Sequence, residues 1–228
     1  AVKTIAHKHG LHATFMPKPI FGIAGSGMHI NISMAKDGKN VFCDESDKNG
    51  LSSTAYSFIA GIMEHIKGMT AITNPLVNSY KRLVPEFEAP VYIAWSAQNR
   101  SPLIRVPASR GQGTRVELRS ADPSANPYLA LAVTIAAGLD GVKRGLVPPP
   151  AVDGNIYSMS AAQRKKQKIE MLPTSLESAI AELKKDKLIC NTLGEHILEK
   201  YIEAKELEWL NYKTRISQWE IDEYLSKY

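Results

Sequence analysis

The segment Met28–Met34, with the sequence MHINISM, carries three side chains that could bind a metal ion or a nucleotide. His29, Asn31 and Ser33 alternate there with methionine and isoleucine residues. Period-two alternation is typical of a strand with one buried face, and successive polar groups on the other face lie about 6 to 7 Å apart. The pattern therefore predicts a strand that presents an imidazole, an amide and a hydroxyl group to one site.

A second alternating segment, Thr114–Ser120 (TRVELRS), carries charged side chains instead. Arg115, Glu117 and Arg119 fall on one face of the predicted strand. Arginines bind phosphates and carboxylates, and a carboxylate is a ligand for hard divalent cations. The alternative is a solvated strand face whose charges pair with neighbouring strands. The pattern alone leaves both interpretations open.

The positive charge of the chain is concentrated in the segment 81–119. This segment has seven basic and three acidic residues, a net charge of +4, whereas the whole chain has a net charge of +5. Such a local field indicates an anionic ligand. Nucleic acid is the alternative, but the segment lacks an interleaved aromatic platform, and we expect no direct nucleic-acid binding. The generic phosphate loop GxxxxGK[ST] is absent from the sequence. The candidate anion ligands are Arg100, Arg105, Arg115 and Arg119, and the candidate metal ligands are His29 and Glu117.

The elements that must position these side chains indicate the α+β class. We predict a sheet-rich portion over residues 1–150 and a helical portion over residues 151–228. Strands are predicted at 12–16, 28–34, 102–106 and 114–120, and helices at 51–73, 127–143, 174–185, 188–213 (with a break near Gly194) and 216–228.

Local signals mark where several of these helices begin. Ser52 or Ser53 can cap the first long helix, and Asn126 can cap the next, with Pro127 in its first turn. The segment 173–177 has the pattern of a capping box. Because the helix that follows Pro127 is apolar nearly all round, we expect it to be buried.

Several function classes are excluded by the sequence. The longest apolar run, Tyr128–Leu139, is twelve residues, too short for a membrane span, and the N-terminal segment has no basic-then-apolar pattern, so we expect no signal peptide. Cys43 and Cys190 have no metal-binding spacing and suit a reducing cytoplasm, so we expect a cytoplasmic location without membrane contact. The chain starts at Ala1 in a helix-like segment, which suggests a fragment of a longer protein.

Three long motifs resemble those of glutamine synthetases. The motif KPIFGIAGSGMHINIS (residues 18–33) is similar to the ATP-region signature, and the segment 78–111 is similar to the substrate loop and the block after it. TRVELRSADPSANPYLALA (residues 114–132) is similar to the next block. The order of the motifs is that of the family, and details resemble the Gram-positive subtype of the bacterial type I enzymes. The resemblance covers the C-terminal part of the catalytic domain.

The resemblance implies a role for each matching position. It implies that His29 and Glu117 bind a divalent ion, Mg²⁺ or Mn²⁺, near the ATP phosphates. Glu88 would lie on a flap over glutamate, and Arg100 and Arg119 would act on the reacting groups. The implied ATP contacts are Asn31, Ile32, Ser33, Arg100 and Arg105, and the implied glutamate contacts are Ala24, Gly25, Arg82, Glu88, Arg100 and Arg119.

The implied reaction is the ATP-dependent joining of ammonia to L-glutamate through γ-glutamyl phosphate. The family enzyme is a homo-oligomer, a double ring of six, and relatives bind nitrogen-responsive transcription factors. We expect the chain alone to be inactive, because the N-terminal domain and the first metal site of the family lie before the matched part. The alternatives are a γ-glutamyl ligase for another amine and a non-catalytic regulatory interaction module.

Three positions concern regulation or depart from the family pattern. Ala24 stands where asparagine is common, so a side-chain contact to glutamate is missing. Glu86 stands where glycine is usual and adds a negative charge beside the expected flap. We expect Glu86 to weaken glutamate binding, and an unchanged Michaelis constant in Glu86→Gly would contradict this. Tyr157 matches a regulatory tyrosine of some relatives, but we expect no modification in this subtype.

Overall fold

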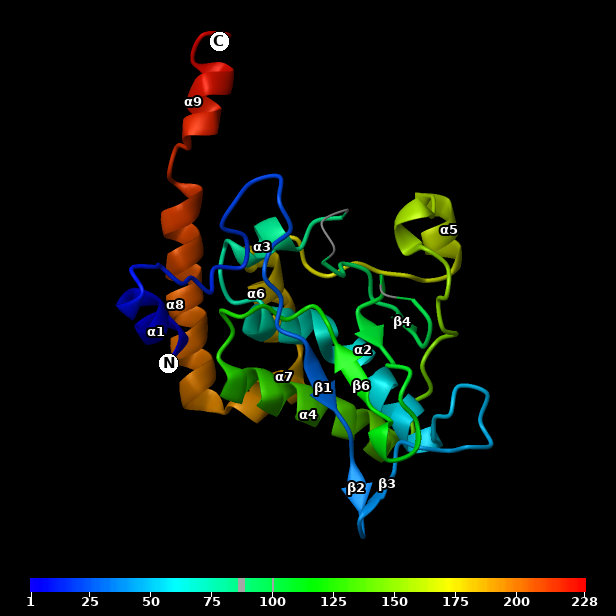
Figure 1. Cartoon of the computed structure of the whole chain (residues 1–228). Helices are drawn as coiled ribbons and strands as arrows, with labels where there is room; N and C mark the ends of the chain where they lie inside the picture. The colour runs from blue at the N-terminus through cyan, green and yellow to red at the C-terminus, as the bar shows by residue number, and fades with distance from the viewer. Residues whose placement is uncertain (86–88, 100) are drawn as a thin grey trace.

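The computed structural model describes residues 1–85, 89–99 and 101–228. Figure 1 shows a small central sheet, long helices packed against it, and a helical C-terminal end that projects from the body. This mixed architecture confirms the α+β prediction. The described helices are α1 (Val2–Lys8), α2 (Ser53–Thr73), α3 (Ser79–Arg82), α4 (Pro127–Arg144), α5 (Ala161–Lys166), α6 (Leu176–Lys185), α7 (Lys187–Leu193), α8 (Glu195–Lys213) and α9 (Gln218–Tyr224), with 3₁₀ turns η1 (Gly111–Gly113) and η2 (Ile156–Ser158).

Four short strands form the central sheet in the order β1-β6-β5-β4. They are β1 (Ile30–Ile32), β4 (Trp95–Ser96), β5 (Ile104–Arg105) and β6 (Val116–Leu118). β6 pairs antiparallel with both β1 and β5, and β4 runs parallel to β5. A separate hairpin consists of β2 (Ala35–Lys36) and β3 (Lys39–Asn40). The regular pairing is shorter than the alternating segments predicted.

The register of the sheet sorts side chains into two kinds of row. Ile30 and Ile104 both pair with Leu118, and all three belong to the hydrophobic core. At the neighbouring position of each of these three strands, Asn31 and Arg105 both pair with Glu117. Because side chains alternate between faces, the apolar row anchors the sheet and the polar row lies on its other face.

Helices α2 and α4 pack so closely that only glycine fits at the crossing. A Cβ atom at Gly61 would lie 2.2 Å from the carbonyl oxygen of Ala137. A Cβ atom at Gly141 would lie 2.1 Å from the carbonyl oxygen of Ser57. Both values are far below van der Waals contact, so the two backbones touch directly and form a rigid layer behind the sheet.

The predicted helix starts are largely confirmed. Ser52 accepts a hydrogen bond from the backbone at the start of α2, and Asn126 does the same for α4. The capping box of α6 is formed by Ser175 and Ser178, one residue later than predicted. Gly194 separates α7 from α8, as the break in the pattern indicated.

Two sequence predictions about this fold are wrong. Residues 12–16 form no regular strand. Helix α4 is not buried all round, since Tyr128, Leu131, Ile135 and Leu139 expose between 43% and 82% of their surface. The helix places its small residues against α2, because only they allow the close crossing, and its large apolar side chains therefore lie on the outer face.

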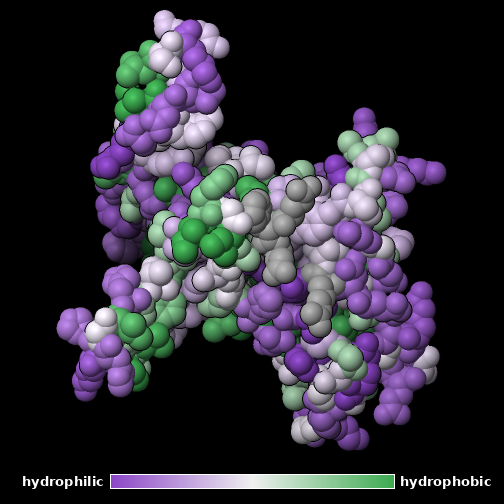
Figure 2. All heavy atoms as spheres, turned by 45° about the horizontal axis from the view of Figure 1, so that its top comes forward, coloured by the Kyte–Doolittle hydropathy of each residue, from purple (hydrophilic) through white to green (hydrophobic). Residues whose placement is uncertain are grey.

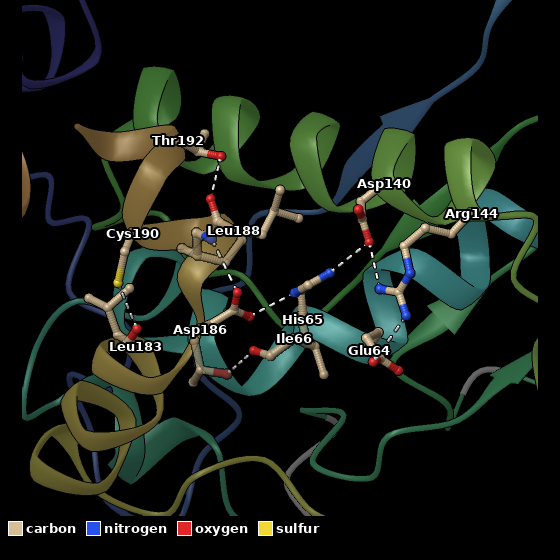
Figure 3. Close-up of polar contacts among 12 residues, drawn as sticks. Glu64, His65, Ile66, Asp140, Arg144, Leu183, Asp186, Leu188, Cys190 and Thr192 are labelled. Carbon is tan, nitrogen blue, oxygen red and sulfur yellow. Dashed lines mark hydrogen bonds and ion pairs between the residues drawn. The ribbon is translucent and has the colours of Figure 1, made fainter.

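A partly buried ionic cluster joins helices α2, α4 and α7. His65 of α2 contacts Asp186, the N-cap of α7, at 2.8 Å and Asp140 of α4 at 3.2 Å (Figure 3). Asp140 also pairs with Arg144 at 2.8 Å, and Arg144 approaches Glu64 at 3.7 Å. Hydrogen bonding to Asp186, then to Asp140, raises the pKa of His65 against the opposing effect of burial.

The C-terminal end leaves apolar side chains on the surface. Trp219 and Tyr224 of α9 contact each other edge to face and are 63% and 47% exposed. Figure 2 shows apolar surface over this end and over the N-terminal segment, where Phe21 is 97% exposed. Among the described helices, none combines the length and the hydropathy that a membrane crossing requires.

Candidate active site

Glu117 lies at the centre of the polar row and joins two of the predicted ligands. Its Oε1 atom lies 2.9 Å from Nδ1 of His29, and its Oε2 atom lies 3.3 Å from Nε of Arg105. Glu117 is only 7% exposed, whereas the side chain of His29 is 39% exposed. The solvated part of the alternative is therefore wrong for Glu117, because its carboxylate is buried, whereas the expected ion pair with a neighbouring strand does occur, through Arg105 of β5.

This pair has the donor chemistry of half a divalent cation site. A carboxylate and an imidazole are both accepted ligands of Mg²⁺ or Mn²⁺, and two groups 2.9 Å apart can converge on one ion. No cluster of three or more metal-binding side chains (His, Cys, Asp or Glu) occurs among the described residues. His29 and Glu117 therefore fit a metal site to which further ligands must be added.

The other predicted residues of this segment, Asn31, Ile32 and Ser33, lie on or directly after β1, which is an edge strand of the sheet. Asn31 is exposed, and its Oδ1 atom accepts a hydrogen bond of 3.1 Å from Nε of Arg115. Ser33 is exposed and Ile32 is partly buried. Arg115 therefore lies at the exposed rim of the site, where the side chain of Asn31 binds it, and not at the centre beside Glu117.

A pair of buried arginines forms the second part of the site. Arg82 is 4% exposed and Arg119 is 9% exposed. The guanidinium of Arg82 donates to the carbonyl oxygen of Ser120 at 2.7 Å and to that of Arg119 at 3.5 Å. Burial, and to a smaller degree the charge of Arg119, lowers the pKa of Arg82, whereas Asp122 raises it. Two neighbouring buried cations form a strong recognition site for carboxylates.

The loop 22–27, here called the glycine-rich loop because it contains Gly22, Gly25 and Gly27, brings the two parts of the site together. A Cβ atom at Gly27 would lie 2.6 Å from Nη2 of Arg82 and 3.6 Å from Nε2 of His29. A Cβ atom at Gly25 would lie 2.2 Å from the carbonyl oxygen of Pro17. Gly27 therefore leaves the space in which the arginine and the histidine meet. Sequence reasoning singled out Gly25 and missed Gly27, although the GSG sequence was the available signal.

Asn78 ties this loop to the helix that carries Arg82. Its side chain accepts from the backbone N–H of Lys18 at 2.8 Å and donates to the carbonyl of Lys18 at 3.0 Å. Asn78 is the N-cap position of α3, which ends at Arg82. Ala24 is exposed on the same loop. The two hydrogen bonds of Asn78 fix the loop relative to Arg82, a role that no sequence pattern predicted.

Three of the predicted residues lie outside the described part of the chain: Glu86, Glu88 and Arg100. The segment next to them is well packed, because Tyr157 donates a hydrogen bond of 2.9 Å from its hydroxyl to the carbonyl of Ala89. Ala89 is 2% exposed and Tyr157 is partly buried.

The chain as a whole has counterparts among known proteins. Residues 1–224 match the family model of the glutamine synthetase catalytic domain. The chain belongs to this family. The resemblance found in the three motifs is thereby confirmed.

Individual relatives agree with the family match. The chain is 59% identical over 227 residues to a glutamine synthetase of Clostridium saccharobutylicum and 57% identical to one of Thermus thermophilus, in each case over 100% of this chain and 51% of the relative. It is thus similar to about half the length of these curated relatives.

Solved structures of the family agree in fold. One described as a GmaS/ADP complex superposes with a TM-score of 0.89 at 38% identity, over 99% of this chain and 52% of the other. A structure of GmaS without ligand superposes with a TM-score of 0.85 at 38% identity, over 98% of this chain and 50% of the other.

Proposed function

We propose that this chain supplies the nucleotide and glutamate side of a glutamine synthetase active site. The reaction is the ATP-dependent joining of ammonia to L-glutamate to form L-glutamine. The observation that carries the proposal is the contact of His29 and Arg105 with the same buried carboxylate, Glu117, beside the arginine pair. Family membership supports it. Because the chain matches about half of each relative, the activity belongs to the native gene product that carries this sequence.

The reaction has two steps. An oxygen of the glutamate side-chain carboxylate attacks the γ-phosphorus of ATP, and the bond to the bridging oxygen breaks, which releases ADP and leaves γ-glutamyl phosphate. The nitrogen of ammonia then attacks the acyl carbon, phosphate leaves, and the nitrogen loses a proton. Both steps develop negative charge on phosphoryl oxygens, which fixed cations stabilise.

We assign these roles to the described residues as follows. Arg82 and Arg119 hold glutamate carboxylates from buried positions, and Arg105 faces the phosphates from the interior strand β5. His29 and Glu117 would hold a divalent cation. When bound, such an ion neutralises charge on phosphate oxygens.

The remaining roles fall on predicted residues whose structure is not described. Arg100 would add a second cation at the phosphates. Glu88 would cover glutamate and receive a proton from ammonium. The solved structure described as an ADP complex supports the nucleotide part of the proposal. A cytoplasmic location, a double-ring oligomer and nitrogen-responsive transcription factors as partners are further proposals for the native gene product.

The test is an assay of phosphate release by the native gene product with ATP, glutamate and ammonium. We expect release to depend on all three. Glu117→Gln should weaken Mn²⁺ binding, measured by titration, by about tenfold or more, because it removes a charged ligand. Glu45→Gln makes the same chemical change at an exposed position and should leave the affinity unchanged.

Two outcomes would contradict the proposal. Release that depends on a primary amine but not on ammonium would indicate a γ-glutamyl ligase for another amine. A protein without ATP turnover under any of these conditions would indicate a non-catalytic module.

A further inference from the structure

Asn74 occupies a buried position next to the candidate site and has no role in the function proposed above. It is the C-cap residue of α2 and is 0% exposed. Its Nδ2 atom donates to the carbonyl of Ser120 at 2.9 Å and to Oδ2 of Asp122 at 3.2 Å. Its Oδ1 atom accepts from the hydroxyl of Thr73 at 2.9 Å. An amide that is buried with its oxygen and nitrogen both in use has a fixed orientation.

The carbonyl of Ser120 connects this amide to the glutamate site. It accepts both the Nδ2 atom of Asn74 at 2.9 Å and the Nη1 atom of Arg82 at 2.7 Å. Two donors on one carbonyl restrict its direction, since each lone pair is already used. Any rotation of this peptide group would therefore move the guanidinium of Arg82. The next carbonyl, that of Ala121, accepts from the backbone of Met28 at 2.9 Å, so the peptide also holds the glycine-rich loop.

Asp122 supplies the negative charge of the same cluster. It is 0% exposed, and a buried carboxylate is unfavourable unless hydrogen bonds or opposite charges compensate it. Ser124 donates its backbone N–H to Oδ1 at 3.0 Å, and Asn74 donates to Oδ2. The charge of Asp122 favours the protonated form of Arg82, which counteracts the repulsion between Arg82 and Arg119.

We propose that Asn74 and Asp122 are positioning residues for glutamate. Asn74 fixes the Ser120 carbonyl that orients Arg82, and Asp122 fixes Asn74 and balances the arginine pair. Neither residue touches the substrate. The proposal rests on the proposed function, because it assigns a purpose to the position of Arg82. The competing interpretation is that Asn74 only ends helix α2, in which case its loss would affect stability and both substrates alike.

The experiment separates these two interpretations with three variants of the native gene product. Asn74→Ala removes the donor to Ser120. The exchange variant Asn74→Asp with Asp122→Asn retains the carboxylate–amide pair and the net charge, but it offers Ser120 no donor. Thr70→Val is the matched control, because Thr70 is 1% exposed on the same helix and its hydroxyl donates to the carbonyl of Ile66 at 2.7 Å, away from Ser120.

For each protein we would measure kcat, the Michaelis constants for glutamate and ATP, and the melting temperature. Asn74→Ala and the exchange variant should raise the constant for glutamate by about tenfold or more, as expected when a charge-assisted contact is lost. The constant for ATP should stay within about twofold. Thr70→Val should lower the melting temperature and leave the constant for glutamate unchanged.

An unchanged constant for glutamate in the exchange variant would overturn the inference, as would equal increases for glutamate and ATP. If Asn74→Ala is too unstable to purify, the exchange variant decides alone. Failure of the proposed function gives a different result, because the unmodified protein would then show no glutamate-dependent phosphate release, and the inference would fail with it.

Discussion

Gly27 offers the sharpest test of how the two parts of the site meet. Replacement by alanine would place a methyl carbon 2.6 Å from Nη2 of Arg82. An ordinary carbon–nitrogen contact is about 3.5 Å, so the guanidinium would have to move by about 0.9 Å. Its hydrogen bond to Ser120, now 2.7 Å, would lengthen to about 3.6 Å if the shift were directed away from the carbonyl, which is beyond hydrogen-bond range.

The size of the effect follows from the charge on the donor. A hydrogen bond to a charged group contributes about 1.5 to 3 kcal/mol, so Gly27→Ala should raise the Michaelis constant for glutamate by about ten- to hundredfold. Stability should also fall, by up to about the same 1.5 to 3 kcal/mol, because the lost hydrogen bond is buried and present without substrate; the lower entropy of the unfolded chain with alanine offsets part of this loss. The distance of 3.6 Å to His29 is an ordinary contact, so the constant for ATP should not change.

The assay is steady-state phosphate release with glutamate and ATP varied in turn, together with the melting temperature. Gly154→Ala serves as the control, because the nearest atom to its Cβ, in Met159, is 3.8 Å away. A Michaelis constant for glutamate within about twofold of that of the unmodified protein would refute the reasoning, since it would mean that Arg82 can move and still bind the substrate equally well.

The helix layer leads to two further predictions, each checked by thermal unfolding of the native gene product. Gly61→Ala should destabilise the fold by about 3 kcal/mol or more, because its Cβ would lie 2.2 Å from the carbonyl oxygen of Ala137 and relief of this clash requires a backbone shift. A melting temperature equal to that of the control variant Gly154→Ala would contradict this prediction. The pKa of His65 is raised above its unfolded value of about 6.5 by Asp186 and then Asp140, so its contribution to stability is complete below that value and is lost as pH rises through the folded pKa. The melting temperature of His65→Gln should therefore fall further below the unmodified protein at about pH 6 than at about pH 8.5, and a pH-independent difference would exclude a role for the charge.

The sequence could predict the polar row of the sheet because it depends on local alternation. The patterns around His29 and Glu117 each assign one face to polar residues, and antiparallel pairing then brings the two faces together. In the structure, Nδ1 of His29 and Oε1 of Glu117 lie 2.9 Å apart across these adjacent segments. What the patterns could not give is the burial of Glu117 and its contact with Arg105, which depend on the register of three strands.

The contacts around Arg82 were beyond sequence reasoning for a different reason. They join Gly27, Arg82 and Ser120, residues that are far apart in the chain and belong to a loop, a short helix and a strand end. The periodicity of residues within one segment does not predict contacts between segments that are far apart in the sequence. The same limit explains the error on α4, where hydropathy indicated burial but the close glycine crossing at Gly141 decided which face turned inward.

Helix α2 connects the stability of the fold with the glutamate side of the site. Gly61 holds it against α4, His65 ties it to α4 and α7, and its last turn delivers Asn74 to the Ser120 carbonyl. Glu117 does not depend on this helix in the same way, because strand pairing and His29 hold it from the sheet. A perturbation that shifts α2 should therefore weaken glutamate binding before it weakens binding of the metal ion.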